Sequence, residues 1–173
     1  NYYVGSTADP AVGVYGSAWS SANPYQIGIQ FPVNIPQGAV ITSAFLEVEP
    51  ESLASSGNPD MRVYVAGFDS DGSAVSNFSS GLPEIEDRYE WVDTSVDWEV
   101  GVRWLSDVRI QQRSPELRSL IQNVISDSRW SSNNFMVLML DYMYSGSYTA
   151  RNSIKGAYGS RFSQNELPRL FVE

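Results

Sequence analysis

Six consecutive apolar residues, 135 to 140, constrain this chain more than any other stretch. They read Phe-Met-Val-Leu-Met-Leu. Since successive side chains of a strand point to opposite faces of its sheet, such a run is apolar on both faces. A strand of this kind must be covered on both sides. We therefore expect residues 135–140 to be a central strand, with the rest of the chain arranged around it.

An amphipathic helix is predicted immediately before this strand, at about residues 115–127. Ser114 can cap it with a hydroxyl, Pro115 suits the first helical position, and Glu116 suits the positive end of the helix dipole. The following Trp-Ser-Ser-Asn-Asn sequence is typical of a turn and predicts that the helix ends near residues 128–129. The apolar residues recur at helical spacing and form one stripe for the sheet: Leu117, Leu120, Ile121, Val124 and Ile125.

Short alternating strands are predicted on either side of this block. The turn between the first two longer strands should be of type I, with Pro36 at its second position and Gly38 at its fourth. A loop is expected at residues 50–59. The predicted strands are residues 26–33, 40–49, 61–68, 91–98 and 170–172, with weak strands at 2–4 and 12–15.

Alternation assigns faces on three of these strands. Residues of the first strand that share one face are Ile27, Ile29, Phe31 and Val33. On the second strand one face carries Ala44, Leu46 and Val48, and the other carries Phe45, Glu47 and Glu49. On the strand at 91–98 one side carries Val92, Thr94, Val96 and Trp98.

Many short strands, frequent turns and one helix indicate a mostly β fold. The architecture that fits best is an antiparallel β-sandwich of the jelly-roll type, with the helix closing one end or edge. A length of 173 residues suits one domain, and no repeat or linker divides the sequence. We expect a single β-sandwich domain over residues 1–173.

The composition removes several kinds of chemistry. The chain has no Cys, so it has no disulfide framework and no Cys-based metal site. It has no His, which removes the usual general base and the commonest zinc ligand. Paired carboxylates could still hydrolyse glycosides, but any acidic β-protein offers such pairs. We expect no enzyme activity.

The charge and hydropathy of the chain argue against two classes of partner. A net charge of −9 repels phosphate backbones and anionic lipid, so nucleic acid and membranes are not expected partners. No segment approaches the ~20 apolar residues that span a bilayer. The chain begins at Asn1 rather than Met, and we expect that other residues preceded it.

Five segments, taken in order, carry a resemblance to known proteins: residues 35–46, 63–71, 96–98, 113–117 and 130–134. Together they resemble a poorly characterised module of bacterial extracellular proteins and phage virion proteins, and the similarity runs from about residue 26 to the end. The helix-then-strand block is also similar to DNRLRE-type carbohydrate-binding jelly rolls. The resemblance implies a β-sandwich without catalytic activity that binds glycan or builds a particle or fibre.

Aromatic residues supply the candidate binding sites, since 13% of the chain is aromatic. Tyr and Trp rings stack on sugars and dominate protein contacts, and Arg adds stacking and hydrogen bonds. One cluster follows the central strand and the other lies in the first loop. We expect ligand or partner binding at Tyr142, Tyr144, Tyr148 and Arg151, and at Trp19 and Tyr25. Four other tryptophans are expected in the core: Trp91, Trp98, Trp104 and Trp130.

One turn offers a candidate metal site. Asp69 and Asp71 stand two positions apart in an Asp-Ser-Asp-Gly turn, as carboxylates do in calcium loops. No Glu completes a twelve-residue calcium loop, and ordinary turn chemistry explains the same residues. Calcium at these two residues is the only cofactor we predict.

Three functions remain open at this point. The first is a structural or attachment module on the exterior of a phage particle or cell, with decoration, fibre or adhesion as its role. Its partners would be other copies of itself or neighbouring virion or surface proteins. The second is a carbohydrate-binding module of an extracellular protein. The third and least favoured is a glycan-active enzyme. All three predict an extracellular or virion-surface location.

Overall fold

The apolar stretch at residues 135–140 forms the middle of a sheet. The computed structural model describes residues 2–3, 11–13, 27–53, 60–75, 93–99, 112–143, 151–154 and 167–173. In it, strand β9 (Phe135–Tyr142) pairs with β3 (Ile27–Pro32) on one side and β6 (Met61–Ala66) on the other. Leu138 of β9 stands opposite Ile29 of β3 and Val65 of β6. The prediction of a central strand is confirmed.

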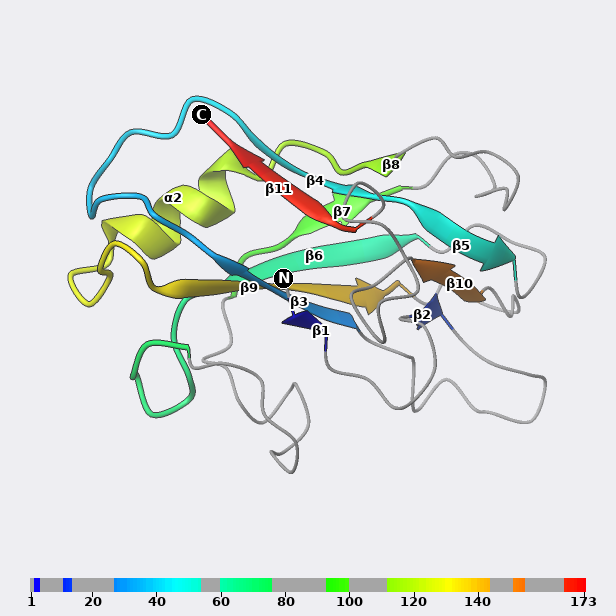
Figure 1. Cartoon of the computed structure of the whole chain (residues 1–173), viewed down its shortest axis with the longest axis horizontal. Helices are drawn as coiled ribbons and strands as arrows, with labels where there is room; N and C mark the ends of the chain where they lie inside the picture. The colour runs from blue at the N-terminus through cyan, green and yellow to red at the C-terminus, as the bar shows by residue number, and fades with distance from the viewer. Residues whose placement is uncertain are drawn as a thin grey trace.

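Three antiparallel sheets and one helix make up the described part of the chain (Figure 1). The first sheet has the order β1-β3-β9-β6-β7, where β1 is Tyr2–Tyr3 and β7 is Val96–Trp98. The second has the order β11-β4-β8, formed by Arg169–Val172, Ala44–Val48 and Gln112–Arg113. The third has the order β2-β10-β5, formed by Ala11–Gly13, Arg151–Ile154 and Pro50–Leu53. The predicted mostly β, antiparallel fold is confirmed.

The main core is shared by two sheets and the helix. Alternate residues of β9 enter this cluster, including Leu138 and Leu140, and so do Leu46 of β4 and Ile121 of the helix. The opposite face of β9 is covered by a second, smaller cluster of buried residues, which consists of Ala66, Val75, Val137 and Met139. Both faces of β9 are therefore covered, as its sequence requires.

Helix α2 (Arg118–Ser126) begins three residues later than predicted. Leu117 occupies the N-cap position and makes no side-chain capping bond. The prediction that Ser114 caps the helix is wrong, because its hydroxyl accepts the Leu46 N–H at 2.9 Å and donates to the Pro115 carbonyl at 2.8 Å. Glu116 lies outside the helix too, although its carboxylate accepts the Arg118 N–H at 3.0 Å.

The apolar stripe of α2 faces the core as predicted. The helix lies at one end of the molecule, at the left of Figure 1, and the β2–β10–β5 sheet lies at the other. Gly67, directly after β6, allows the close approach of the helix, because a Cβ there would overlap Val124 Cγ1. All five stripe residues are buried: Leu117, Leu120, Ile121, Val124 and Ile125.

A loop from residues 33 to 41 wraps the C-terminal end of α2. The Gly38 N–H donates to the Ile125 carbonyl at 2.9 Å, and the Gln122 amide donates to the Ala39 carbonyl at 2.9 Å. The turn in this loop differs from the predicted type I. The Ala39 N–H donates to the Pro36 carbonyl at 3.2 Å, so Pro36 is first and Gly38 is third. A φ of +71° at Gly38 is the third-position requirement of a type II turn.

Three predicted strand boundaries are wrong. The strand expected at 40–49 is β4 alone, because residues 39 to 43 are held by the helix and by Glu173 instead. The loop expected at 50–59 begins with β5. Of the strand expected at 91–98, the structure describes residues 93–98, and within these the pairing is confined to Val96–Trp98, opposite residues 61 to 63 of β6. Thr94 is exposed outside the pairing.

Two of the four core tryptophans can be placed. Trp98 and Trp130 are buried, and the Trp130 indole donates to the Ile35 carbonyl at 2.9 Å. A buried indole needs such a partner for its N–H. Trp91 and Trp104 lie outside the described residues. Within the described ranges, no helix has both the length and the apolar character to cross a membrane.

Candidate functional site

The outer face of the β11–β4–β8 sheet carries a concentrated group of aromatic and arginine side chains. Alternation along β4 puts Ala44, Leu46 and Val48 in the core, with 0%, 0% and 1% exposure. Phe45 and Glu47 therefore belong to the opposite face. Because β11 and β8 flank β4, side chains from three distant parts of the sequence meet on this face.

Three planar groups stack side by side across this face. The rings of Phe171 on β11 and Phe45 on β4 are directly opposite in register, with centroids 4.9 Å apart and planes at 21°. On the other side of Phe45, the guanidinium carbon of Arg113 on β8 lies 3.8 Å from the ring centroid. We call Phe171, Phe45 and Arg113 the stacked row. Phe171 is 38% exposed and stands on the outermost described strand, so the row ends in an accessible ring.

A carboxylate fixes the orientation of the arginine in this row. Glu47 stands opposite Arg113 in register, and its Oε1 accepts Arg113 Nε at 3.0 Å and Nη2 at 2.6 Å. The Glu47 side chain is only 10% exposed, whereas that of Arg113 is 58% exposed. The guanidinium therefore has its plane set by a buried partner and a ring while it still reaches solvent. An oriented Arg beside aromatic rings is typical of contact surfaces.

Sequence reasoning missed this row. Alternation puts Phe45 on the same face as Glu47 and Glu49, and a large apolar residue among carboxylates is the signal that could have found it. Arg113 and Phe171 could not be connected to it from the sequence, since their strand pairings are not local.

The predicted Tyr and Arg sites are only partly covered by the structure. Tyr142 is the last residue of β9, opposite Met61, and Arg151 is the first residue of β10, opposite Gly13. These two residues belong to different sheets. The remaining predicted residues lie outside the described part of the chain, and binding there stays a prediction: Tyr144, Tyr148, Trp19 and Tyr25.

The Asp69 and Asp71 turn is held by its own hydrogen bonds. The Asp69 N–H donates to the Ser73 carbonyl at 2.8 Å, and Asp71 Oδ1 accepts the Ser73 N–H at 2.9 Å. Hydrogen bonds from Ser73 hold the pKa of Asp71 below its ordinary value. Among the described residues no group of three or more carboxylates is placed to hold a metal. Calcium at Asp69 and Asp71 stays a prediction.

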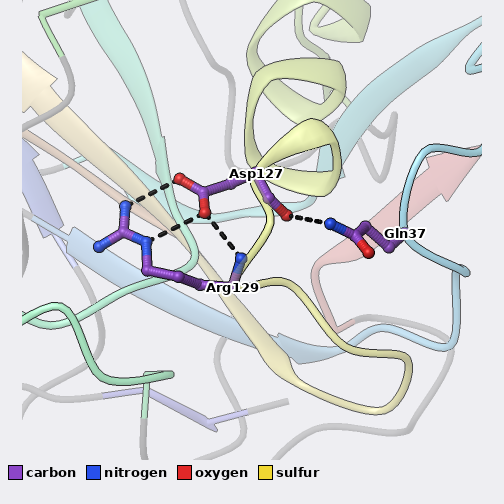
Figure 2. Close-up of polar contacts among 3 residues, drawn as sticks. All are labelled: Gln37, Asp127 and Arg129. Atoms are coloured by element: carbon purple, nitrogen blue, oxygen red, sulfur yellow. Dashed lines mark hydrogen bonds and ion pairs between the residues drawn. The ribbon is translucent and has the colours of Figure 1, made fainter.

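Arg129 is bound to Asp127 at the C-terminal end of the helix (Figure 2). Its Nε and Nη2 donate to the two carboxylate oxygens of Asp127 at 3.0 and 2.8 Å, and its N–H donates to Oδ1 at 2.8 Å. These bonds from Arg129 lower the pKa of Asp127 to about 2. The Asp127 carbonyl accepts the Gln37 amide at 3.0 Å, and the Arg129 guanidinium lies 4.2 Å from the Phe68 ring centroid. This group stabilises the fold locally.

Comparison of the chain with family models, with curated proteins and with solved structures finds no match. The candidate site therefore depends on the geometry of the chain itself.

Proposed function

We propose that this chain is a non-catalytic structural and attachment module on the exterior of a phage particle or a cell. We also propose that its three antiparallel sheets form a β-sandwich of the jelly-roll type. The core that the first and second sheets share with α2 supports this architecture. The resemblance of the sequence to extracellular and virion modules supports the location.

The stacked row is the observation that carries the attachment role. Aromatic rings and Arg are enriched at protein contacts and at the hot spots that dominate binding energy. Here Phe171, Phe45 and Arg113 are held by one another and by Glu47 before any partner arrives. A surface that is already ordered loses less entropy on binding.

A carbohydrate-binding module is the second candidate. The row also offers what a sugar requires, namely the exposed ring of Phe171 for stacking and the charged groups of Arg113 and Glu47 for hydroxyls. The two candidates differ in the expected state of the free protein. A structural module associates with itself or with a neighbouring surface protein, whereas a glycan-binding module is a monomer.

Light scattering and a glycan array on the purified chain test the proposal, with Phe171→Ala as the variant. The matched control is Val40→Ala, because Val40 is 81% exposed and belongs to the loop before β4 rather than to the three strands that carry the row. We expect association or attachment to be lost in Phe171→Ala and kept in Val40→Ala. Melting temperatures check folding, since losing the ring pair costs roughly 0.5–1.5 kcal/mol.

Two results would count against the structural role. A monomer that binds a glycan through Phe171 favours the carbohydrate-binding module instead. A chain that neither associates, nor attaches to cells or particles, nor binds any glycan contradicts both candidates.

A further inference from the structure

Strand β11 presents an open edge among the described strands. The Glu173 N–H donates to the Ser43 carbonyl at 2.9 Å, and the Ser43 N–H donates back at 3.4 Å, so these residues form a hydrogen-bonded pair. Hydrogen-bonded and non-hydrogen-bonded residue pairs alternate along two antiparallel strands, and therefore the main-chain groups of Phe171 also point toward β4. Those of Leu170 and Val172 point the other way, toward the open edge.

Hydrogen bonds on the other side of β4 confirm which main-chain groups of β11 point outward. Ala44 and Leu46 are the register partners of Val172 and Leu170, so their main-chain groups must point away from β11. They do, because the Ala44 carbonyl accepts the Leu117 N–H at 2.7 Å and the Leu46 carbonyl accepts the Ser114 N–H at 2.8 Å. An edge with aligned main-chain groups is a template for another strand.

The sequence of this edge is complementary to itself. Two copies of β11 placed antiparallel around a two-fold axis at Phe171 align Leu170 with Val172 of the second copy. These are the residues with outward main-chain groups, so both pairs exchange hydrogen bonds. The same register places Arg169 opposite Glu173 of the second copy, and opposite charges at that spacing attract.

Side chains on both faces of β11 fit the same arrangement. On the outer face, the two Phe171 rings meet, so the two stacked rows join into one that ends in Arg113 on each side. On the inner face, Leu170 and Val172 are half-buried and line a pocket of about 220 Å³ together with residues 31 to 35. A second β11 would cover this apolar edge.

We propose that two copies of this chain pair antiparallel through β11, in the register centred on Phe171. The inference rests on the proposed function, because it names the surface through which the module associates with itself. A net charge of −9 on each copy opposes the pairing, but the Debye length is only about 8 Å at physiological salt. A short strand pair gives a weak dimer, which many copies on one particle strengthen through avidity.

The first test removes one edge donor. Val172→Pro deletes an N–H that points outward and leaves the ladder to β4 intact, and Pro is tolerated on edge strands. Val172→Ala is the matched comparison, because it also shortens this interface side chain but keeps the N–H. Sedimentation from about 1 to about 100 µM should show a dimer for the parent. The dissociation constant of Val172→Pro should be raised at least about tenfold above that of Val172→Ala, which isolates the loss of the N–H from the loss of the side chain.

The second test exchanges the charges across the two-fold axis. Glu173→Arg places two arginines opposite each other and should weaken the dimer, as should Arg169→Glu with two carboxylates. The double variant Arg169→Glu/Glu173→Arg restores opposite pairs and should recover the dimer. A single variant whose loss came only from misfolding would not be rescued, and melting temperatures identify it directly.

Two outcomes overturn the inference. One is a parent chain that stays monomeric over this concentration range. The other is a dimer that persists in folded Val172→Pro or ignores the charge exchange, because it then uses another surface. A monomer that still attaches to cells or particles leaves the proposed function standing, whereas a β11 dimer without any attachment or assembly contradicts that function alone.

Discussion

At the scale of single residues, Ile121 is the most direct test of the core. It lies at the middle of the α2 stripe and is fully buried. Truncation to Ala removes apolar contacts and leaves a cavity, so we expect Ile121→Ala to lower the free energy of unfolding by about 2–5 kcal/mol. Denaturant unfolding measures this. Ser119→Ala on the exposed side of the same helix is the control, and similar losses in both variants would contradict the assignment of faces.

Asp127 gives a prediction about acid stability. Bonds from Arg129 lower the folded pKa of Asp127 from 3.8 to about 2. A carboxyl group whose pKa is lower in the folded protein than in the unfolded chain stabilises the fold at any pH above the unfolded pKa. This contribution is lost as the pH falls from about 4 toward 2. Asp127→Asn should therefore lower the free energy of unfolding at pH 7 by roughly 0.2–1 kcal/mol, the contribution of an exposed ion pair. Its melting temperature at pH 7 should fall accordingly.

The dependence of stability on pH separates the titration of Asp127 from a loss of stability that is the same at every pH. Between pH 4 and pH 2 the melting temperature of Asp127→Asn should fall less steeply than that of the parent. Some slope remains, because hydrogen bonds also lower the pKa values of Asp71 and Glu116. Equal slopes in parent and variant would show that Asp127 does not carry the effect.

The polar residues around the helix start show where sequence reasoning reaches its limit. Ser114 and Glu116 have the right chemistry for capping, and both do bind backbone N–H groups. However, Ser114 binds Leu46 at 2.9 Å, and Glu116 accepts the Ala44 N–H at 2.6 Å in addition to that of Arg118. The sequence shows that an oxygen is available, but the strand that uses it comes from about seventy residues earlier.

At the scale of elements, Gly67 controls how closely α2 packs on β6. A Cβ at this position would overlap Val124 Cγ1 and would lie 3.4 Å from Trp130 Cζ3. We expect Gly67→Ala to cost about 1–3 kcal/mol by overpacking. The double variant Gly67→Ala/Val124→Ala relieves the overlap, so its loss should be smaller than the sum of the two single losses. Additive losses would mean that the helix simply moves away.

Elements were predictable where their pattern is local. The five stripe residues of α2 and the two apolar faces of β9 follow from periodicity, and both are buried as expected. The ends were not predictable, because the start of β4 is set by contacts of residues 39 to 43 with the helix and with Glu173. The turn at Pro36 was also misassigned, since the Gly38 N–H bonds to the helix end.

At the scale of the whole molecule, the strand order decides which residues share a surface. The stacked row joins β11, β4 and β8, whose positions in the sequence are far apart. Alternation separates Phe45 from Ala44 and Leu46, but only the register places Phe171 opposite it. Most of the core was therefore predictable from sequence, whereas the candidate contact surface was not.

The loop that wraps the end of α2 has a consequence for the order of folding. This helix has nine residues, and isolated helices shorter than ~12–15 residues are marginal in water. Its Gln122 and Asp127 bind residues 81 to 90 positions earlier in the chain. Closing a loop of that length requires entropy to be lost before the contacts form, which slows folding. We therefore expect the helix to become stable only as the strands assemble, rather than to act as an early nucleus.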